Sequence, residues 1–246
     1  MIVFMRTKLM QKVWIKYSTY ILIISLFFIL RNSSLAFGGY THYYICSKVV
    51  CGEENFKNLS EEEKLAYKSG AVMADVGRFY FDDFFPASDE ETFKNELINI
   101  SLKSDDKKLK LFALGWSDHV IQDRHVSEVF GRLFKRITNY RIGCGKCDSY
   151  VYGDVGYLSE DKLFSPYSMI KQTYNKFTIK NIPLKVKNKT IKKEVFKILM
   201  AFYAQSWLGM MGLSVEESQI AEKEFKNLAL LCGTHNPDYK ILFPDN

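Results

Sequence analysis

Residues 114–127 read LGWSDHVIQDRHVS and lie in the longest stretch of helical periodicity in the chain, from 109 to about 134. They hold two of the chain's four histidines, His119 and His125. Residues four apart share one face of a helix, so His119 and Asp123 point the same way, with Cβ atoms roughly 6 Å apart. An imidazole nitrogen and a carboxylate oxygen at that spacing suit one divalent cation such as zinc. The same spacing also serves an ordinary surface hydrogen bond, so the pair alone does not define a site.

The chain from residue 37 onward is predicted to be mostly helical. Two capping boxes, Ser-Glu-Glu-Glu at 60–63 and Ser-Val-Glu-Glu at 214–217, each precede apolar residues at helical spacing. Glycines and prolines in 140–189 predict an irregular insert with short helices and room for a small β-hairpin. The tail after residue 236 is expected to be extended. The predicted helices are 60–76, 88–102, 109–134, 190–211 and 214–231. The fold class that follows is all-α, in a single domain.

The first 36 residues have the pattern of an export signal. They hold five basic residues and no acidic one, with an eleven-residue apolar run at 20–30. Ser34 and Ala36 are small residues at the −3 and −1 positions of a cleavage site that would make Phe37 the mature N-terminus. A membrane span needs about 20 apolar residues, so a cleaved signal peptide, 1–36, is expected, with the protein secreted or periplasmic. An uncleaved membrane anchor is the alternative.

The net charge of +6 belongs almost entirely to that first segment. Without its five basic residues, 29 basic side chains face 28 acidic ones. A nearly neutral domain gives no indication of a phosphate-backbone surface, so nucleic acid is not the expected partner.

The five cysteines fit an oxidising compartment without defining a metal site. They are Cys46, Cys51, Cys144, Cys147 and Cys232. A zinc ribbon needs two close pairs on turn-like knuckles, whereas Cys46 sits in an apolar stretch. Local or crossed disulfides are therefore expected ahead of a dithiol redox motif, and the odd cysteine would remain a thiol.

Three sequence elements occur in an order that matches a known family. The expected mature N-terminus reads Phe37-Gly-Gly-Tyr-Thr-His42; a second element reads Gly70-Ala-Val-Met-Ala-Asp75; a third reads Leu114-Gly-Trp-Ser-Asp-His119 and continues to Asp123. Together they resemble the zinc-dependent phospholipase C family and its relatives, the S1/P1-type nucleases. The second element is similar to the family's Gly-Ala-x-x-Pro-Asp, with alanine for proline, and the third to its Leu-Gly-x-x-x-His. The resemblance covers about residues 37–130.

This resemblance implies an exported all-α protein with zinc ions held between helices. Phe37, through its amino nitrogen and carbonyl oxygen, and His42 would hold one zinc ion, and Asp75 with His119 a second. Asp123 would bridge the two, and Asp75 would also be the candidate for activating water. The α-amino group has a pKa near roughly 7.7–8 and must lose its proton to bind, so the site would weaken as pH falls. Two zinc ions are expected, and at most three.

Several family positions have no match here. The family supplies another histidine between the second and third elements, where this chain has none, and later histidines for a third zinc ion, where this chain has only His125 before His235. The candidate substitutes are Asp82, Asp83, His125 and Glu128. On a continuous helix His125 lies roughly 120° around the axis from His119, so it reaches the same ion only if the helix ends near Asp123.

The activity that the resemblance implies is zinc-dependent hydrolysis of phosphodiesters in phospholipid head groups at a membrane surface. Two alternatives stay open. An S1/P1-type nuclease is suggested by the five-residue step from Phe37 to His42, and it would need an aromatic platform for bases. A non-catalytic descendant that keeps a metal for stability, or none, is suggested by the missing histidines.

Overall fold

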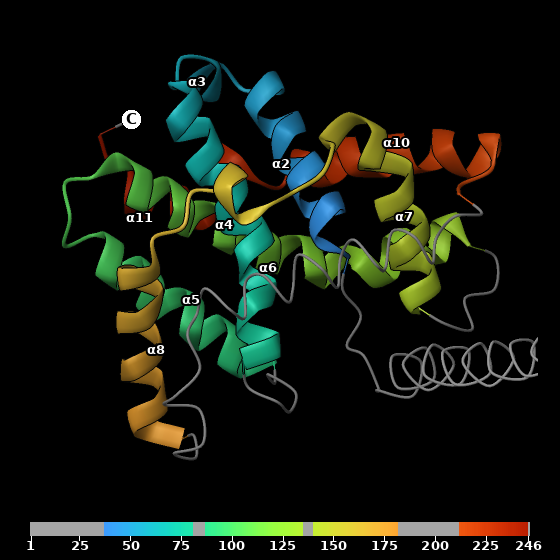
Figure 1. Ribbon diagram of the computed structural model, residues 1–246. Helices are drawn as coiled ribbons and strands as arrows, with labels where there is room; N and C mark the ends of the chain where they lie inside the picture. The colour runs from blue at the N-terminus through green and yellow to red at the C-terminus, as the bar shows by residue number, and fades with distance from the viewer. Residues whose placement is uncertain (1–36, 81–86, 135–139, 182–211, 246) are drawn as a thin grey trace, which may run out of the picture. The chain divides into compact units, whose positions relative to one another are not determined.

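The computed structural model describes residues 37–80, 87–134, 140–181 and 212–245, all within the compact unit Leu35–Asn246. The described residues form helices and no strand, which confirms the all-α class (Figure 1). None of the helices described is long and apolar enough to cross a bilayer. The helices are α2 (Gly39–Gly52), α3 (Glu54–Lys57), α4 (Glu61–Tyr80), α5 (Ala87–Ser101), α6 (Lys107–Leu133), α7 (Tyr140–Val155), α8 (Tyr167–Asn181), α10 (Val215–Ala229) and α11 (Pro237–Leu242), with 3₁₀ turns at Glu160–Lys162 and Gly233–His235.

Four of the five predicted helices are confirmed as α4, α5, α6 and α10, and the fifth, 190–211, lies outside the described residues. The capping boxes explain where two of them begin. At α4 the Ser60 hydroxyl accepts from the Glu63 backbone N–H at 3.2 Å, and the Glu63 carboxylate accepts from the Ser60 N–H at 2.8 Å. Ser214 and Glu217 make the same reciprocal pair at α10.

The prediction for residues 140–189 was wrong in detail, because α7 and α8 are full-length helices and no hairpin occurs among the described residues of this segment. Packing overrides glycine's low helix propensity here: the Cβ position of Gly143 lies 3.2–3.4 Å from the rings of Phe134 and Phe130. The tail is not extended either. Asn236 caps α11 by accepting from the Asp238 N–H at 2.9 Å, and Pro237 supplies the first helical residue.

Helices α4 and α6, which carry Asp75 and His119, cross at close range. A Cβ added at Gly70 would stand 2.0 Å from the carbonyl oxygen of Phe112, and one at Gly115 would stand 1.9 Å from that of Tyr67. Only glycine permits the two backbones to approach so closely. The two glycines of the recognised sequence elements therefore set the distance between α4 and α6.

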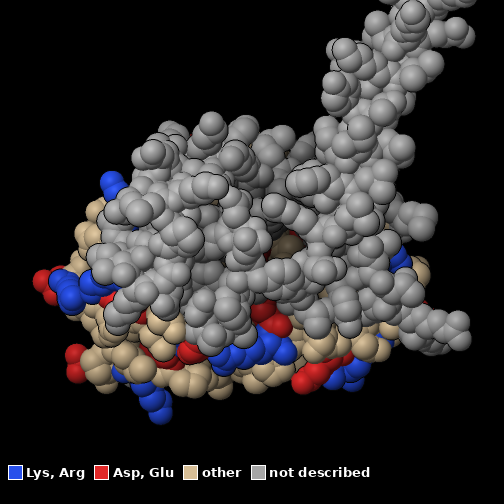
Figure 2. Space-filling view, turned by 90° about the horizontal axis from the view of Figure 1, so that it is seen from below, with Lys and Arg blue, Asp and Glu red and all other residues tan. Residues whose placement is uncertain are grey.

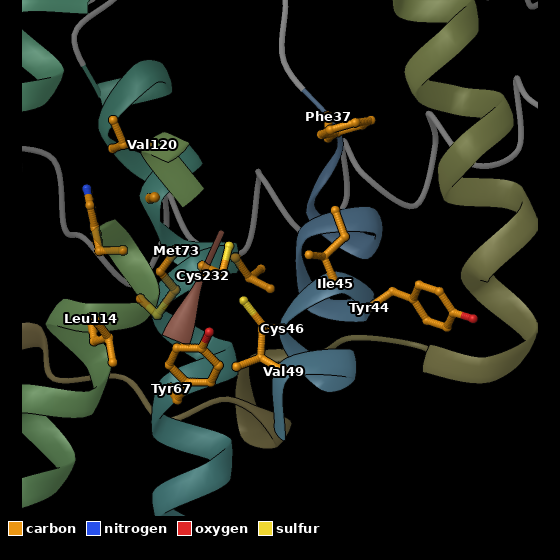
Figure 3. Close-up of a cluster of buried hydrophobic side chains, with 14 of the residues drawn as sticks. Phe37, Tyr44, Ile45, Cys46, Val49, Tyr67, Met73, Leu114, Val120 and Cys232 are labelled. Carbon is orange, nitrogen blue, oxygen red and sulfur yellow. The ribbon is translucent and has the colours of Figure 1, made fainter. Parts of the chain in front are cut away.

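α2 packs against α4, α7 and α10, and its buried face contributes much of the core. Figure 3 shows Ile45, Cys46 and Val49 on the α2 side of this cluster and Tyr67 and Met73 on the α4 side. All five are at most 2% exposed. Each large apolar side chain buried in this way stabilises the fold by about 1.5–3 kcal/mol, so α2 is fixed firmly against α4.

Candidate metal centre

His42, His119 and Asp123 meet in the interior between α2 and α6. One ligand atom from each side chain lies within 4.8 Å of the other two. The Asp123 carboxylate lies between the rings: His42 Nε2 is 3.3 Å from Oδ1 and His119 Nε2 is 3.1 Å from Oδ2. The imidazole centroids are 3.9 Å apart with the planes at 33°. This buried group can hold a metal ion, and its members come from two of the three elements that the sequence singled out.

Hydrogen bonds fix which nitrogen of each imidazole faces Asp123. His119 Nδ1 lies 2.8 Å from the carbonyl oxygen of Ala71 on α4, and His42 Nδ1 lies 2.7 Å from Oε1 of Gln122. Both partners are acceptors, so Nδ1 carries a hydrogen in each ring, and in the neutral imidazole Nε2 presents its lone pair. Nε2 is therefore the ligand atom, oriented from behind by a second hydrogen bond as metal-bound histidines are.

Two further carboxylates face the same nitrogen of His119. Asp75 Oδ1 of α4 is 3.8 Å from His119 Nε2, and Glu90 Oε1 of α5 is 3.9 Å from it. Asp75 is only 4% exposed, Asp123 9%, and the Glu90 side chain 15%. Burying several carboxylates together is costly unless positive charge is close.

The donor set fits a metal ion. In the described structure the buried His42 Nε2 makes no hydrogen bond, although it points at Asp123. A lone pair facing a carboxylate oxygen is repelled unless a cation or a proton lies between them. Two imidazoles with up to three carboxylates are ligands that zinc accepts, whereas magnesium and calcium favour sets made of oxygens alone.

Phe37, which the sequence predicts as the first residue after cleavage, lies at the same cluster. Its backbone nitrogen is 3.3 Å from Asp123 Oδ1. Its ring is buried edge-to-face against Phe130 at 5.3 Å and Phe225 at 6.1 Å. These aromatic contacts hold the Phe37 backbone beside the Asp123 carboxylate.

Asp148 of α7 fixes the first turn of α2, which carries His42. Its Oδ1 accepts from the Thr41 backbone N–H at 2.9 Å and from the Thr41 hydroxyl at 2.6 Å. A carboxylate satisfies N–H groups that a helix N-terminus leaves without partners. Burial raises the pKa of Asp148 to about 7, although the Thr41 hydrogen bonds act in the opposite direction.

Neither His125 nor Glu128 is brought to the cluster. His125 Nδ1 lies 2.9 Å from the Ile121 carbonyl of its own helix, and the exposed Glu128 faces Arg132 at 3.9 Å. α6 continues unbroken to Leu133, so His125 stays on another side of the helix from His119. Asp82 and Asp83 lie outside the described residues.

Glu90 and Gln122 were missed by the sequence analysis. Glu90 belongs to the acidic start of the 88–102 helix, where carboxylates are ordinarily explained by the helix dipole. It lies 15 residues after Asp75, between the second and third elements, where the family has its additional histidine. Gln122 does not ionise, and its spacing of three from His119 carries no metal signal.

The acid next to His119 has a structural role. Asp118 accepts hydrogen bonds from the Tyr67 hydroxyl, from the Gly233 N–H at 3.0 Å and from Asn236 Nδ2 at 2.6 Å. Burial raises its pKa to about 7 in spite of these three donors. Asp118 thus joins α6 to α4 and to the chain that leads into α11.

Comparison of the chain with protein-family models, curated proteins and solved structures gave no match.

Proposed function

We propose that this protein is a zinc-dependent phosphodiesterase of phospholipase C type. The observation that carries the proposal is the convergence on the Asp123 carboxylate of His42 from α2, His119 from α6 and the Phe37 backbone nitrogen. These atoms come from positions 37, 42, 119 and 123, the ones carried over from the family resemblance. Asp75 completes that set at 3.8 Å from His119.

Each residue has a distinct part in this proposal. His42, His119 and Asp123 would hold the metal, with Asp75, Glu90 and the Phe37 nitrogen as additional donors. A bound zinc ion supplies Lewis-acid chemistry, since it polarises a phosphoryl group and lowers the pKa of coordinated water. Asp75 would accept a proton from water at its carboxylate, and Ala71 and Gln122 keep the imidazoles in the ligating tautomer.

Surface charge supports a lipid head group over a nucleic acid as the substrate. Figure 2 shows Lys and Arg interspersed with Asp and Glu on the described part of the face in view. A nuclease that follows a phosphate backbone uses a positively charged groove, with aromatic side chains for the bases. The balanced charge of the chain after residue 36 agrees with this preference.

A metal that stabilises the fold without catalysis is the second candidate, and burial favours it. His42 and His119 are 0% exposed, and Asp123 is 9% exposed. Structural zinc sites are closed by protein ligands, whereas catalytic ones keep a position for water. Substrate turnover therefore has to be measured separately from metal content.

The test combines elemental analysis with hydrolysis of phosphatidylcholine vesicles and of single-stranded DNA. We expect at least one zinc ion per chain, head-group release, and little DNA cleavage. His119→Ala should lose both zinc and hydrolysis. His235→Ala is the matched control, because that side chain is 61% exposed and faces Glu53. Zinc without hydrolysis of either substrate would establish the structural role, and a metal-free active protein would contradict both candidates.

The position of Phe37 allows a separate test of processing. A chain that begins at Phe37 places a primary amine where the Phe37 nitrogen now lies, 3.3 Å from Asp123. A chain that begins one residue earlier, at Ala36, places an amide there, which is a far poorer zinc ligand. We expect the first to bind zinc more tightly in chelator competition. Equal affinities would show that the terminal amine is not a ligand.

A further inference from the structure

Two buried cysteines from opposite ends of the described chain share one hydrogen-bond donor. Gln122 Nε2 lies 3.5 Å from Cys46 Sγ on α2 and 3.6 Å from Cys232 Sγ, which precedes the Gly233–His235 turn. Both cysteines are 0% exposed. Figure 3 shows the side chains of Cys46 and Cys232 in the same buried cluster as Tyr67. All five cysteines of the chain are thiols in the structure.

The backbones at the two positions are also close. A Cβ added to Gly233 would stand 2.6 Å from Val49 Cγ1, and Val49 lies one helical turn beyond Cys46 on the same face of α2. Glu53, a further turn along, accepts from the Thr234 N–H at 2.9 Å. The chain at 232–234 therefore runs along the face of α2 that carries Cys46. A disulfide requires Cα atoms about 4.4–6.8 Å apart, and these contacts bring the backbone that carries Cys232 alongside the face of α2 that carries Cys46.

We propose that Cys46 and Cys232 are a disulfide-forming pair that fastens the C-terminal segment to α2. The oxidant is a disulfide compound, such as oxidised glutathione or an exported thiol oxidoreductase. The thiolate of one cysteine attacks the oxidant's disulfide and releases one thiol; the second cysteine then attacks the mixed disulfide and releases another. Two cysteine thiols are oxidised, one external disulfide is reduced, and the two cysteine protons end on the two released thiols.

Burial determines when this exchange takes place. Desolvation raises the pKa of both thiols, so the thiolate is scarce once the protein is folded. Formation is therefore expected during folding, before 232–234 packs on α2, and slow in the folded reduced protein. The other close pair, Cys144 and Cys147, lies inside α7, where a bond across three residues would distort the helix.

Peptide mapping tests the pair directly. The full chain is reduced, unfolded, refolded in a glutathione redox buffer with a chelator, alkylated and digested with trypsin. Cleavage after Lys48 and Lys146 places each of the five cysteines in its own peptide. We expect one cross-link, between the peptides of Cys46 and Cys232, and alkylation of the other three cysteines. Circular dichroism first shows that the refolded protein is helical. Alkylation of both Cys46 and Cys232 in that protein overturns the proposal, and so does a cross-link from Cys46 or Cys232 to a different cysteine.

Variants give an independent measure. Reduction should lower the denaturant midpoint of the oxidised wild type and leave that of Cys46→Ser unchanged. Cys51→Ser is the control, because Cys51 is exposed on α2, and it should respond to reduction as the wild type does. A wild-type midpoint that is insensitive to reduction would count against the pair. Neither measurement depends on hydrolysis, so the result stands whether or not the proposed activity is found.

Discussion

His119 on α6 donates a hydrogen bond from Nδ1 to the carbonyl oxygen of Ala71 on α4, 2.8 Å away. The acceptor is a backbone atom of the neighbouring helix, and a helical carbonyl can reach another helix only where the two pass very close together. The glycine contacts at Gly70 and Gly115 create that approach. Orientation of this histidine is thus a result of helix packing, and damage to the packing should appear at the site.

Replacing Gly115 with alanine should destabilise the fold and weaken metal binding together. The added methyl group would stand 1.9 Å from the Tyr67 carbonyl oxygen, and overpacking of this kind costs about 1–3 kcal/mol. Gly131→Ala is the matched control on the same helix, because nothing lies within 4 Å of its Cβ position. That control should be neutral or stabilising, by up to about 1 kcal/mol. Denaturant unfolding with chelator present measures the stability of both variants, and chelator competition measures their zinc affinity. Equal stability of the two variants would refute a tight crossing.

Replacing Gln122 with methionine should lower zinc affinity about 10- to 100-fold, the usual effect of losing a partner behind a ligating histidine. Gln122 touches the cluster only through the hydrogen bond from His42 Nδ1, and methionine keeps a similar volume without accepting it. Gln219→Met, on the exposed side of α10, is the control. Competition with a chromogenic chelator gives the affinities, and an unchanged value for Gln122→Met would mean that His42 needs no orienting partner.

Stability in the presence of a chelator should fall as pH rises from about 4 to about 7. The pKa of Asp148 is raised from 3.8 to about 7 by burial, so the native state keeps a proton that the unfolded state releases. The stabilisation from the neutral Asp148 carboxyl is fully present below the pKa that this group has in the unfolded chain. It is lost as the pH rises through the higher pKa that the group has in the folded protein. Asp148→Asn should flatten this decline, leaving the part that belongs to Asp118, whose pKa is also raised to about 7. A variant with the wild-type slope would contradict the assignment.

Replacing Ser214 with alanine should cost about 1 kcal/mol, because the hydroxyl that accepts from the Glu217 N–H caps the start of α10. Ser218→Ala on the same helix is the comparison, since its hydroxyl bonds only to the Val215 carbonyl within the helix. It should be neutral or slightly stabilising. Thermal unfolding, followed by circular dichroism at 222 nm, where helices absorb, gives the melting temperatures of the two variants. If Ser214→Ala melts at the same temperature as the wild type, the cap contributes nothing to stability.

The predictable part of the fold was the part governed by local rules. Capping boxes and helical periodicity located α4, α5, α6 and α10, because those signals act within one or two turns. α7 was missed because its glycines favour a loop locally, whereas the rings that pack against Gly143 belong to Phe130 and Phe134, outside α7. At the tail, Asn236-Pro237 is a helix-start signal that the sequence itself contains, and it begins the short helix α11.

The site shows the same division. His119 and Asp123 were predicted from helical spacing, which fixes their relative direction whatever the rest of the chain does. Phe37, His42 and Asp75 required a family resemblance, since no periodicity connects His119 to residues that precede it by 44 to 82 positions. Glu90 needed the three-dimensional fold, because its approach to His119 depends on how α5 packs on α6.

The glycine contact at Gly115 also makes α6 intolerant of changes in length. Gly115 and His119 are four residues apart, so both face α4, and Asp123 continues the same line. Deleting one residue between Gly115 and His119 would turn everything beyond it by about 100° around the helix axis. The His119 imidazole would no longer reach the Ala71 carbonyl, and the Asp123 carboxylate would no longer lie beside His42. All the ligand residues would still be present in the sequence. In this region the number of residues matters as much as their identity.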